Sequence, residues 1–396
     1  MHLGPQNYFG RRVTNIVRSS QFFTSLVVFL IAGTAQLFAQ GNGIGTYDLR
    51  SPADLAVAFD YNGTGNADTI LLYRPGAGVV YIVANVSGQW VPVFSSANGI
   101  GGYDLKSPAD RIIPFDYDGS GLADHLVCYR PGAGIVFILK NIGGVFTPVY
   151  NSGHVSGIGG YDLASSSDRL VAFDYNGSGL NDHLLAYRPG TGTVSVLSNT
   201  TGSFAPVFMS STGIGGWPLS GTSDILVPFD YYGVGSADHL IAYTPGTGKV
   251  SILENLGGVF SASMTSTNGI GGYDLLSTSD RLVAYDYNGS GSRDHIITFR
   301  PGVGIFWILQ STYLSFGLVD NDGTGGVGGF DLKSTADRIV PMDYAGMPGA
   351  LFIYRPGQGL AFIETHIGNT FTTVYSSSYV ANYIPGSNKP STTGQF

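Results

Sequence analysis

One short phrase recurs along this chain at a nearly constant spacing. Each copy places an aspartate after an aromatic or apolar residue and before a glycine-containing loop. The six aspartates are Asp60, Asp116, Asp174, Asp230, Asp286 and Asp343. Their separations are 56, 58, 56, 56 and 57 residues. Self-similarity at a fixed period of this length indicates a solenoid, a propeller or an array of domains.

Each repeat contains four short apolar runs separated by turn residues. In the second repeat we expect strands over residues 111–117, 125–130, 135–140 and 146–150. Residues 131–134 (Pro-Gly-Ala-Gly) and 141–144 (Asn-Ile-Gly-Gly) separate the last three runs. Proline presets φ for a turn and glycine supplies positive φ, so these segments predict tight turns between antiparallel strands. No run of useful length has helical periodicity.

Six four-stranded units predict an all-β protein, a single β-propeller of about six blades over residues 40–378. A solenoid coil would be shorter than 56 residues, and separate domains would need linkers that the repeats lack. The composition agrees, because 59 glycines and only 12% charged residues argue against helical bundles. Residues 379–396 are rich in Gly, Ser, Thr, Pro and Asn and are expected to form a flexible tail, or an additional strand that closes the ring.

The N-terminal 39 residues differ from the repeats. Arg11, Arg12 and Arg18 precede an apolar run at residues 22–38, and small residues follow near Ala35 and Ala39. This order is typical of a secretory signal peptide, with a membrane anchor as the alternative. We therefore expect a secreted, extracellular protein, associated with a membrane only if the segment remains uncleaved.

The charge and the cysteine content limit the possible partners and cross-links of the chain. The chain has 19 basic and 27 acidic residues, and because three of the bases lie in the N-terminal segment, the remainder carries a net charge of −11. Such a chain is not expected to bind nucleic acid by neutralising phosphates. Cys128 is the only cysteine, so no intrachain disulfide can form.

The glycine loop after each recurring aspartate is the clearest chemical signal. In four repeats, oxygen-bearing side chains stand at loop positions 1, 3, 5 and 9. These are Asp60, Asn62, Thr64 and Asp68; Asp116, Asp118, Ser120 and Asp124; Asp174, Asn176, Ser178 and Asp182; and Asp286, Asn288, Ser290 and Asp294. Calcium binds six to eight oxygen ligands, so the pattern predicts about four Ca²⁺ sites. The alternative is a metal-free turn stabilised by Asx hydrogen bonds.

These loops resemble the FG-GAP or VCBS-type repeat, which forms the blades of integrin α-subunit propellers. That family carries Asp-x-Asp/Asn-Gly-Asp/Asn-Gly-x-x-Asp between the first two strands of a blade, and the resemblance implies calcium binding there. It covers roughly residues 41–378. Position 5 departs from the family pattern, because Ser or Thr replaces Asp or Asn, which implies weaker binding. In the fourth repeat Tyr232 and Val234 occupy positions 3 and 5, and we expect no metal there.

Other recurring residues have structural interpretations. The histidines that follow position 9, for example His125, are expected to form hydrogen bonds within the blades. The arginines before Pro-Gly, such as Arg130 and Arg188, are expected to pair with acids such as Asp110 and Asp168. Cys128 occupies a position held elsewhere by Leu or Ala and is expected to be buried.

One aromatic residue per repeat lies in the long loop that precedes the first strand. The aromatic ring either stacks on a sugar or fills the gap between blades. As candidate ligand-binding residues we name Tyr103, Tyr161, Trp217, Tyr273, Arg130 and Arg188.

Three classes of function remain. Near-identical blades favour a multivalent binding protein, since repetition raises avidity, and a glycan or an extracellular protein would suit its aromatic and uncharged polar surface. The alternatives are a secreted enzyme with one site on the propeller and a structural or adhesive surface protein. No nucleophile elbow, phosphate-binding loop or zinc motif is present, so we name no catalytic residue.

Overall fold

A computed structural model describes residues 43–153, 157–200, 202–312 and 315–377 of the chain. The expected signal segment, residues 1–39, and the expected tail, residues 379–396, lie outside the described residues. The chain divides into a unit of residues 1–38 and a unit of residues 39–396, and the description that follows concerns the second. Its described part holds no helix long and apolar enough to cross a membrane.

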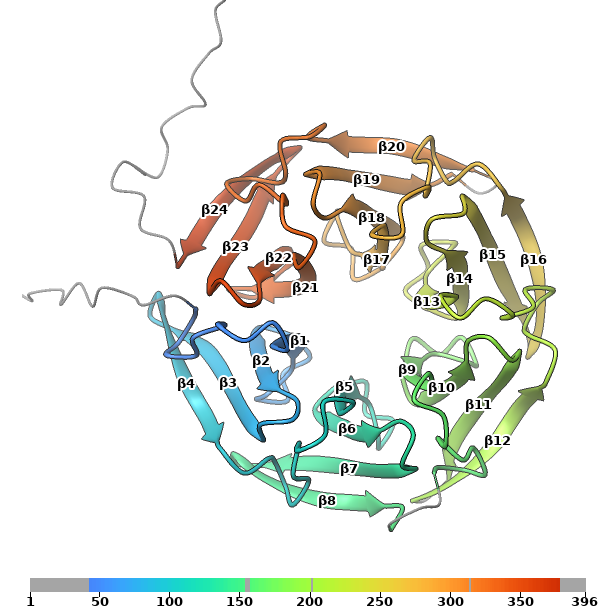
Figure 1. Cartoon of the computed structure of the whole chain (residues 1–396), viewed down its shortest axis with the longest axis horizontal. Helices are drawn as coiled ribbons and strands as arrows, with labels where there is room; N and C mark the ends of the chain where they lie inside the picture. The colour runs from blue at the N-terminus through green and yellow to red at the C-terminus, as the bar shows by residue number, and fades with distance from the viewer. Residues whose placement is uncertain (1–42, 154–156, 201, 313–314, 378–396) are drawn as a thin grey trace, which may run out of the picture. The chain divides into compact units, whose positions relative to one another are not determined.

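The described residues form six four-stranded antiparallel sheets around one axis, and the sheets are the blades of a β-propeller (Figure 1). Blades 1 to 3 comprise β1 (Leu55–Phe59), β2 (Thr69–Arg74), β3 (Val79–Val86) and β4 (Gln89–Ser96); β5 (Arg111–Phe115), β6 (His125–Arg130), β7 (Ile135–Ile142) and β8 (Val145–Asn151); and β9 (Arg169–Phe173), β10 (His183–Arg188), β11 (Thr193–Thr200) and β12 (Ser203–Ser210). Blades 4 to 6 comprise β13 (Ile225–Phe229), β14 (His239–Thr244), β15 (Lys249–Leu256) and β16 (Val259–Ser266); β17 (Arg281–Tyr285), β18 (His295–Arg300), β19 (Ile305–Ser311) and β20 (Phe316–Asn321); and β21 (Arg338–Tyr344), β22 (Met347–Arg355), β23 (Leu360–Ile367) and β24 (Thr370–Ser376).

The predicted propeller is therefore confirmed, with one sequence repeat in each blade. In the second repeat the strand boundaries differ slightly from those expected. β5 ends at Phe115, two residues early, because the carboxylate of Asp116 already accepts hydrogen bonds from the loop amides of Ser120 and Gly121. β7 continues two residues further, to Ile142, and the Gly143-Gly144 turn connects it to β8.

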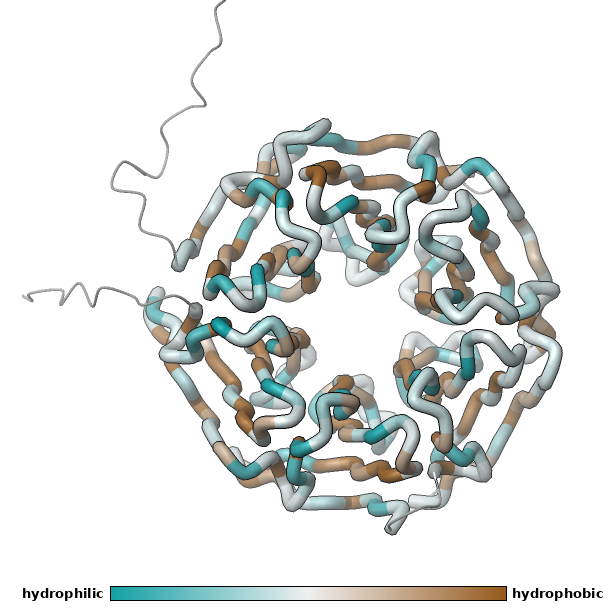
Figure 2. Tube along the Cα trace, viewed as in Figure 1, coloured by the Kyte–Doolittle hydropathy of each residue, from teal (hydrophilic) through white to brown (hydrophobic). Residues whose placement is uncertain are grey.

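The core lies between the blades. Every second residue of a strand faces one neighbouring blade, and the buried apolar residues gather into six clusters at the six blade boundaries. Figure 2 shows the apolar residues concentrated in the strands, with polar residues in the connecting loops. A single blade could not bury both of its faces, so the repeats stabilise one another.

The ring closes by packing between blade 1 and blade 6. Ile70 and Leu72 of blade 1 share a buried cluster with Phe352 and Tyr354 of blade 6. The backbone N–H of Ala56 also donates to the Tyr354 hydroxyl at 3.0 Å. Each described sheet takes all four strands from one repeat, so closure uses no strand exchanged between the ends of the chain.

The same backbone geometry recurs in all six repeats and attaches each long loop to the preceding blade. Leu105, just before blade 2, is fully buried with φ of 51°, a conformation unfavourable for a residue with a Cβ. Its carbonyl accepts hydrogen bonds from the amides of Gly76 at 2.9 Å and Gly78 at 3.1 Å, in the Pro-Gly turn of blade 1. Because all six repeats place a leucine in this conformation, the long loops have the same position at every blade.

Candidate functional site

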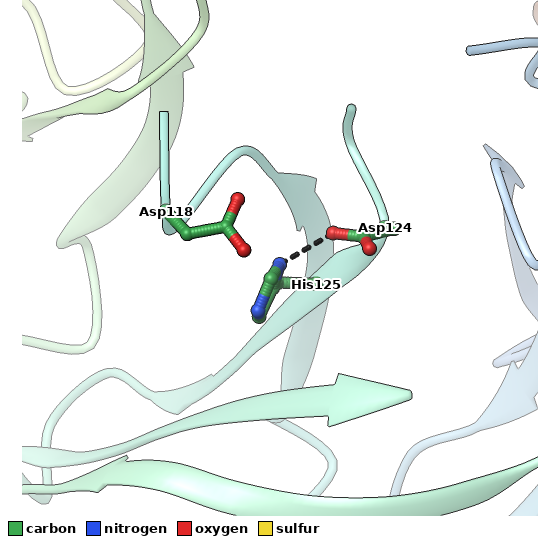
Figure 3. A group of neighbouring side chains, drawn as sticks. All are labelled: Asp118, Asp124 and His125. Atoms are coloured by element: carbon green, nitrogen blue, oxygen red, sulfur yellow. Dashed lines mark ion pairs between the residues drawn. The ribbon is translucent and has the colours of Figure 1, made fainter. Parts of the chain in front are cut away.

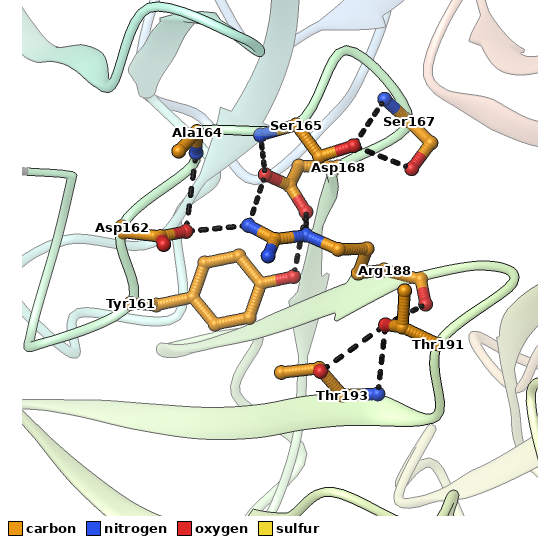
Figure 4. Close-up of polar contacts among 9 residues, drawn as sticks. All are labelled: Tyr161, Asp162, Ala164, Ser165, Ser167, Asp168, Arg188, Thr191 and Thr193. Atoms are coloured by element: carbon orange, nitrogen blue, oxygen red, sulfur yellow. Dashed lines mark hydrogen bonds and ion pairs between the residues drawn. The ribbon is translucent and has the colours of Figure 1, made fainter.

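The long loop, the end of the second strand and the start of the third strand meet at one edge of each blade. In blade 3 (Figure 4), Tyr161 donates its hydroxyl hydrogen to Asp168 at 2.8 Å. Arg188, the last residue of β10, donates to both carboxylate oxygens of Asp168 at 2.7 and 2.8 Å. The same guanidinium donates to Asp162 at 2.5 Å and lies 5.7 Å from the centroid of the Tyr161 ring.

The arginine contacts recur in five blades and confirm the expected arginine–aspartate pairs. The tyrosine hydroxyl is present in four of them, since Phe330 holds its position in blade 6. In each of the five, an arginine binds one fully buried carboxylate and one exposed carboxylate; the buried partners are Asp54, Asp110, Asp168, Asp280 and Asp337, and the exposed partners are Asp48, Asp104, Asp162, Asp274 and Asp331. The exposed aspartates accept a loop amide as well as the guanidinium, and these contacts lower their pKa although partial burial opposes the shift. Each of these five blade edges thus presents an arginine donor beside a carboxylate acceptor.

Blade 4 departs from this pattern. Trp217, Pro218 and Thr244 replace the tyrosine, the exposed aspartate and the arginine. Thr244 donates to the buried Asp224 at 2.5 Å in place of the guanidinium. The Nε1 atom of Trp217 is buried and has no hydrogen-bond partner among the described residues. Blade 4 therefore lacks the donor–acceptor pair.

The loop aromatic residues are buried. The exposed fractions of Tyr103, Tyr161, Trp217 and Tyr273 are 2%, 5%, 8% and 3%. A ring this deeply packed offers almost no face for a sugar, so burial favours the gap-filling alternative for these four rings. Ligand binding by these residues remains a prediction. It would involve the edge of each ring and the guanidinium groups of Arg130 and Arg188 beside the rings.

A second aromatic position, which the sequence interpretation missed, lies at the third residue of the third strand. Tyr81, Phe137, Trp307 and Phe362 hold it in blades 1, 2, 5 and 6, and each is half-buried. Their rings meet the loop aromatic edge-to-face, as in the Tyr273–Trp307 pair with centroids 5.7 Å apart. Blades 3 and 4 carry Ser195 and Ser251 instead. Aligning the third strands of the repeats would have shown this difference between the blades.

The size of the hollow beside the arginine follows from that position. In blade 5 a hollow of about 260 Å³ is lined by Tyr273, Asp274, Arg300 and Trp307. In blade 3 the hollow is about 500 Å³ and is lined by Tyr161, Asp162, Arg188 and Ser195. The serine leaves open the space that an aromatic ring fills elsewhere. The blades therefore offer related but unequal sites.

The glycine loops lie at the opposite ends of the first strands. In blades 1 to 5 the position 1 carboxylate is held by loop amides, as Asp60 is by Thr64 at 2.9 Å and Gly65 at 2.7 Å. In blade 6, Asp343 accepts the Ala67 amide of blade 1 at 2.7 Å instead. Asp230 in blade 4, where no metal is expected, accepts the equivalent amides of Val234 and Gly235. The loop conformation thus needs no metal ligand at positions 3 and 5. This observation supports the Asx-turn alternative as a description of the backbone and leaves calcium binding as a prediction.

The position 9 aspartates lie beside the histidines that follow them. The Nδ1 atoms of His183, His239 and His295 are 2.5, 2.5 and 2.6 Å from a carboxylate oxygen of the preceding aspartate. The expected hydrogen-bonded histidines are therefore confirmed in blades 3, 4 and 5. In blade 2, Nδ1 of His125 lies 2.5 Å from Asp124, but neither ring nitrogen has a hydrogen-bond partner among the described residues. In blade 2 the ligand atoms of Asp118, Asp124 and His125 lie within 4.8 Å of one another (Figure 3). Lys140 also contacts Asp118 at 3.2 Å and neutralises part of that charge.

Carboxylates also crowd one another across the blade boundaries. Burial raises the pKa of Asp174, and the Asp238 carboxylate of the next blade raises it further. The pKa of Asp116 is raised by burial and then by the carboxylates of Asp118 and of Asp182 in the next blade. The predicted ligands of one loop therefore also face the position 9 aspartate of its neighbour. A cation would relieve this repulsion, so the residues present are compatible with a hard divalent ion.

A scan against protein-family models and a search of curated proteins find no match. Solved structures that resemble this chain include an Agrocybe aegerita lectin described as recognising non-reducing terminal N-acetylglucosamine. It is 18% identical, with a TM-score of 0.48, over 81% of this chain and 80% of the lectin. The periplasmic gluconolactonase of Pseudomonas aeruginosa is 12% identical, with a TM-score of 0.41, over 78% and 82% of the two chains. A Lactobacillus plantarum protein is 10% identical, with a TM-score of 0.44, over 78% and 82%. Because the identities are low and the TM-scores lie below 0.5, these similarities do not indicate a function for this chain.

Proposed function

We propose that this protein is a multivalent carbohydrate-binding protein that acts through the hollows at its blade edges. The observation that carries the proposal is the repeated contact between an arginine and an exposed aspartate beside a hollow, as in Arg300, Asp274 and Trp307 of blade 5. A sugar hydroxyl both donates and accepts hydrogen bonds, so adjacent donor and acceptor groups suit it. The half-buried Trp307 ring adds apolar surface against which sugar C–H groups can pack.

Repetition supports a multivalent mode of binding. Five blades carry the arginine–carboxylate pair, while two different hollows, in blades 3 and 5, open beside it. Each site alone is shallow and is expected to bind weakly. Simultaneous occupation of several sites by a branched glycan or a cell surface would raise avidity by roughly 10² to 10⁴ without new contacts. An extracellular location, as the N-terminal segment predicts, would place the protein among such ligands.

A glycan array, probed with and without calcium, tests the proposal. We expect binding to one class of glycan, and Trp307→Ala or Asp274→Asn should reduce the signal several-fold by weakening one site of a multivalent set. Leu276→Ala, an exposed change on the loop that follows Asp274, should leave the signal unchanged. An array without any bound glycan, or equal losses in all three variants, would contradict the assignment.

We also infer that calcium occupies the glycine loops of blades 1, 2, 3 and 5. The supporting observations are the oxygen-bearing residues at loop positions 1, 3, 5 and 9 and the raised pKa of crowded carboxylates such as Asp116 and Asp174. In blade 1, for example, Asp60, Asn62, Thr64 and Asp68 would hold the ion. Bound calcium would neutralise the repulsion between loops and stabilise the blade boundaries.

Thermal unfolding in calcium and in chelator, at equal ionic strength, measures this effect. Each site occupied at a calcium concentration of one hundred times its Kd adds about 2.7 kcal/mol to the free energy of unfolding. We therefore expect a clear rise in the melting temperature with calcium and a smaller one with magnesium. Identical melting temperatures in calcium and chelator would remove the metal assignment.

A further inference from the structure

Four arginines begin the innermost strands of four blades. Arg111, Arg169, Arg281 and Arg338 are the first residues of β5, β9, β17 and β21. The first strands of the blades surround the axis of the propeller (Figure 1), and neighbouring first strands such as β1, β5 and β9 are in contact. The arginines therefore lie at one end of the ring of inner strands, and the carboxylates of the glycine loops lie at the other end.

These arginines have no acidic partner, in contrast to the arginines of the blade edges. Among the described residues none of the four takes part in an ion pair. The aspartate that precedes each of them directs its carboxylate to another arginine; Asp110, for example, binds Arg130 and leaves Arg111 unpaired. The protein thus holds unneutralised positive charge at one place on an acidic chain.

The backbone fixes three of the guanidiniums in the same way. Nη1 of Arg111 donates to the carbonyls of Pro108 and Asp110 at 3.2 and 2.8 Å. Arg281 and Arg338 repeat both contacts with the carbonyls of their own loops. Because these contacts use Nη1 alone, the Nη2 and Nε groups remain available as donors. Such a fork binds an oxyanion in a bidentate manner.

The arginines also lie near one another across blade boundaries. Burial lowers the pKa of Arg338, and the neighbouring Arg281 guanidinium lowers it further. Burial raises the pKa of Tyr187 and Tyr243 to about 12, and Arg169 opposes the rise in both, although Tyr243 belongs to blade 4. All four arginines stand at the same end of the inner strands that surround the axis. They form two neighbouring pairs, in blades 2 and 3 and in blades 5 and 6.

We propose that this end of the ring binds a multivalent phosphate or sulfate anion, with one oxyanion group at each arginine pair. Leu55 and Ile225 hold the equivalent positions in blades 1 and 4, so apolar residues separate the two pairs. A ligand with two or more oxyanion groups would span the axis and contact both pairs. This site is distinct from the hollows at the blade edges and does not depend on glycan binding there.

Titration calorimetry with sodium tripolyphosphate, in chelator and at constant ionic strength, tests the proposal. We expect saturable binding of one tripolyphosphate per chain and at least tenfold weaker binding of orthophosphate, which can reach only one pair. Arg111→Leu with Arg169→Leu, and Arg281→Leu with Arg338→Leu, should each weaken tripolyphosphate binding at least tenfold. Leucine is suited to the position because blade 1 carries it there.

Charge-matched and folding controls make the result decisive. Lys106→Gln with Lys333→Gln removes two exposed charges elsewhere and should leave the affinity unchanged. The single change Arg169→Leu, at an exposed side chain, should still weaken binding if a double variant fails to fold. Dextran sulfate in place of tripolyphosphate distinguishes a polymer ligand from a small one. No binding by the wild type, or equal losses in the lysine and arginine variants, would overturn the proposal.

Discussion

Replacing Asp110 with alanine is expected to lower the free energy of unfolding by roughly 3 kcal/mol. The Asp110 carboxylate is fully buried and accepts hydrogen bonds from Arg130, from the Tyr103 hydroxyl and from the Ser107 amide. Its removal leaves these donors without their acceptor and the guanidinium without its buried partner. Denaturant unfolding of the wild type and the variant measures the difference.

Two matched variants separate the buried pair from general effects of charge. Asp104→Asn removes the exposed partner of the same arginine, and the expected loss is about 0–1 kcal/mol, as for surface ion pairs. Asp224→Ala removes the equivalent buried carboxylate in blade 4, where Thr244 takes the place of the arginine, and the loss should be smaller than at Asp110. Equal losses at Asp110 and Asp224 would show that the guanidinium contributes nothing.

The stability of blade 6 is expected to fall as the pH rises from about 4.5 to about 7. Glu364 is fully buried at a position where the other repeats carry leucine or valine. Burial raises its pKa from 4.5 to about 7; hydrogen bonds from Thr373 and the Gly329 amide oppose the shift, and the Asp322 carboxylate adds to it. The folded protein therefore retains a proton that the unfolded chain has already released in this range.

The predicted loss is roughly 3 kcal/mol over that range, with no further loss above the folded-state pKa. Below pH 4.5 both states are protonated, so this stabilisation is fully present. Thermal melting across the pH range measures the effect, and Glu364→Gln should remove most of the slope. An unchanged slope in Glu364→Gln would show that another group is responsible.

The recurring aspartate and the four apolar runs were sufficient to predict the propeller, the number of blades and most of the strands. Local patterns worked because each turn carries its own glycine or proline and each strand its own alternation. The pairing of Arg130 with Asp110 was also predicted correctly, since it depends on contacts within one repeat. The burial of Cys128 between blades 1 and 2 was predicted from the Leu and Ala residues at the same position of other repeats. Ring closure was left open, because it depends on how Phe352 and Tyr354 pack against the first repeat.

The candidate sites were harder to predict. For Tyr161 and Trp217 the sequence left sugar stacking and gap filling as alternatives. Only their burial in the structure shows that both rings are packed between neighbouring side chains. The difference between Ser195 and Trp307 sets the size of the hollow. These residues lie on the third strands, whereas the sequence analysis considered mainly the loops. The unpaired state of Arg111 could not be predicted either, because the adjacent Asp110 binds an arginine 20 residues away.

The most direct test of the account is the number of glycan sites on one chain. Isothermal titration with the monovalent form of a glycan identified on the array would give this number. We predict more than one weak site per chain, a reduced number in Trp307→Ala, and a large gain in apparent affinity when the same glycan is presented on a multivalent carrier. A single site unaffected by changes at the blade 3 and blade 5 hollows, with no gain from multivalent presentation, would contradict the account.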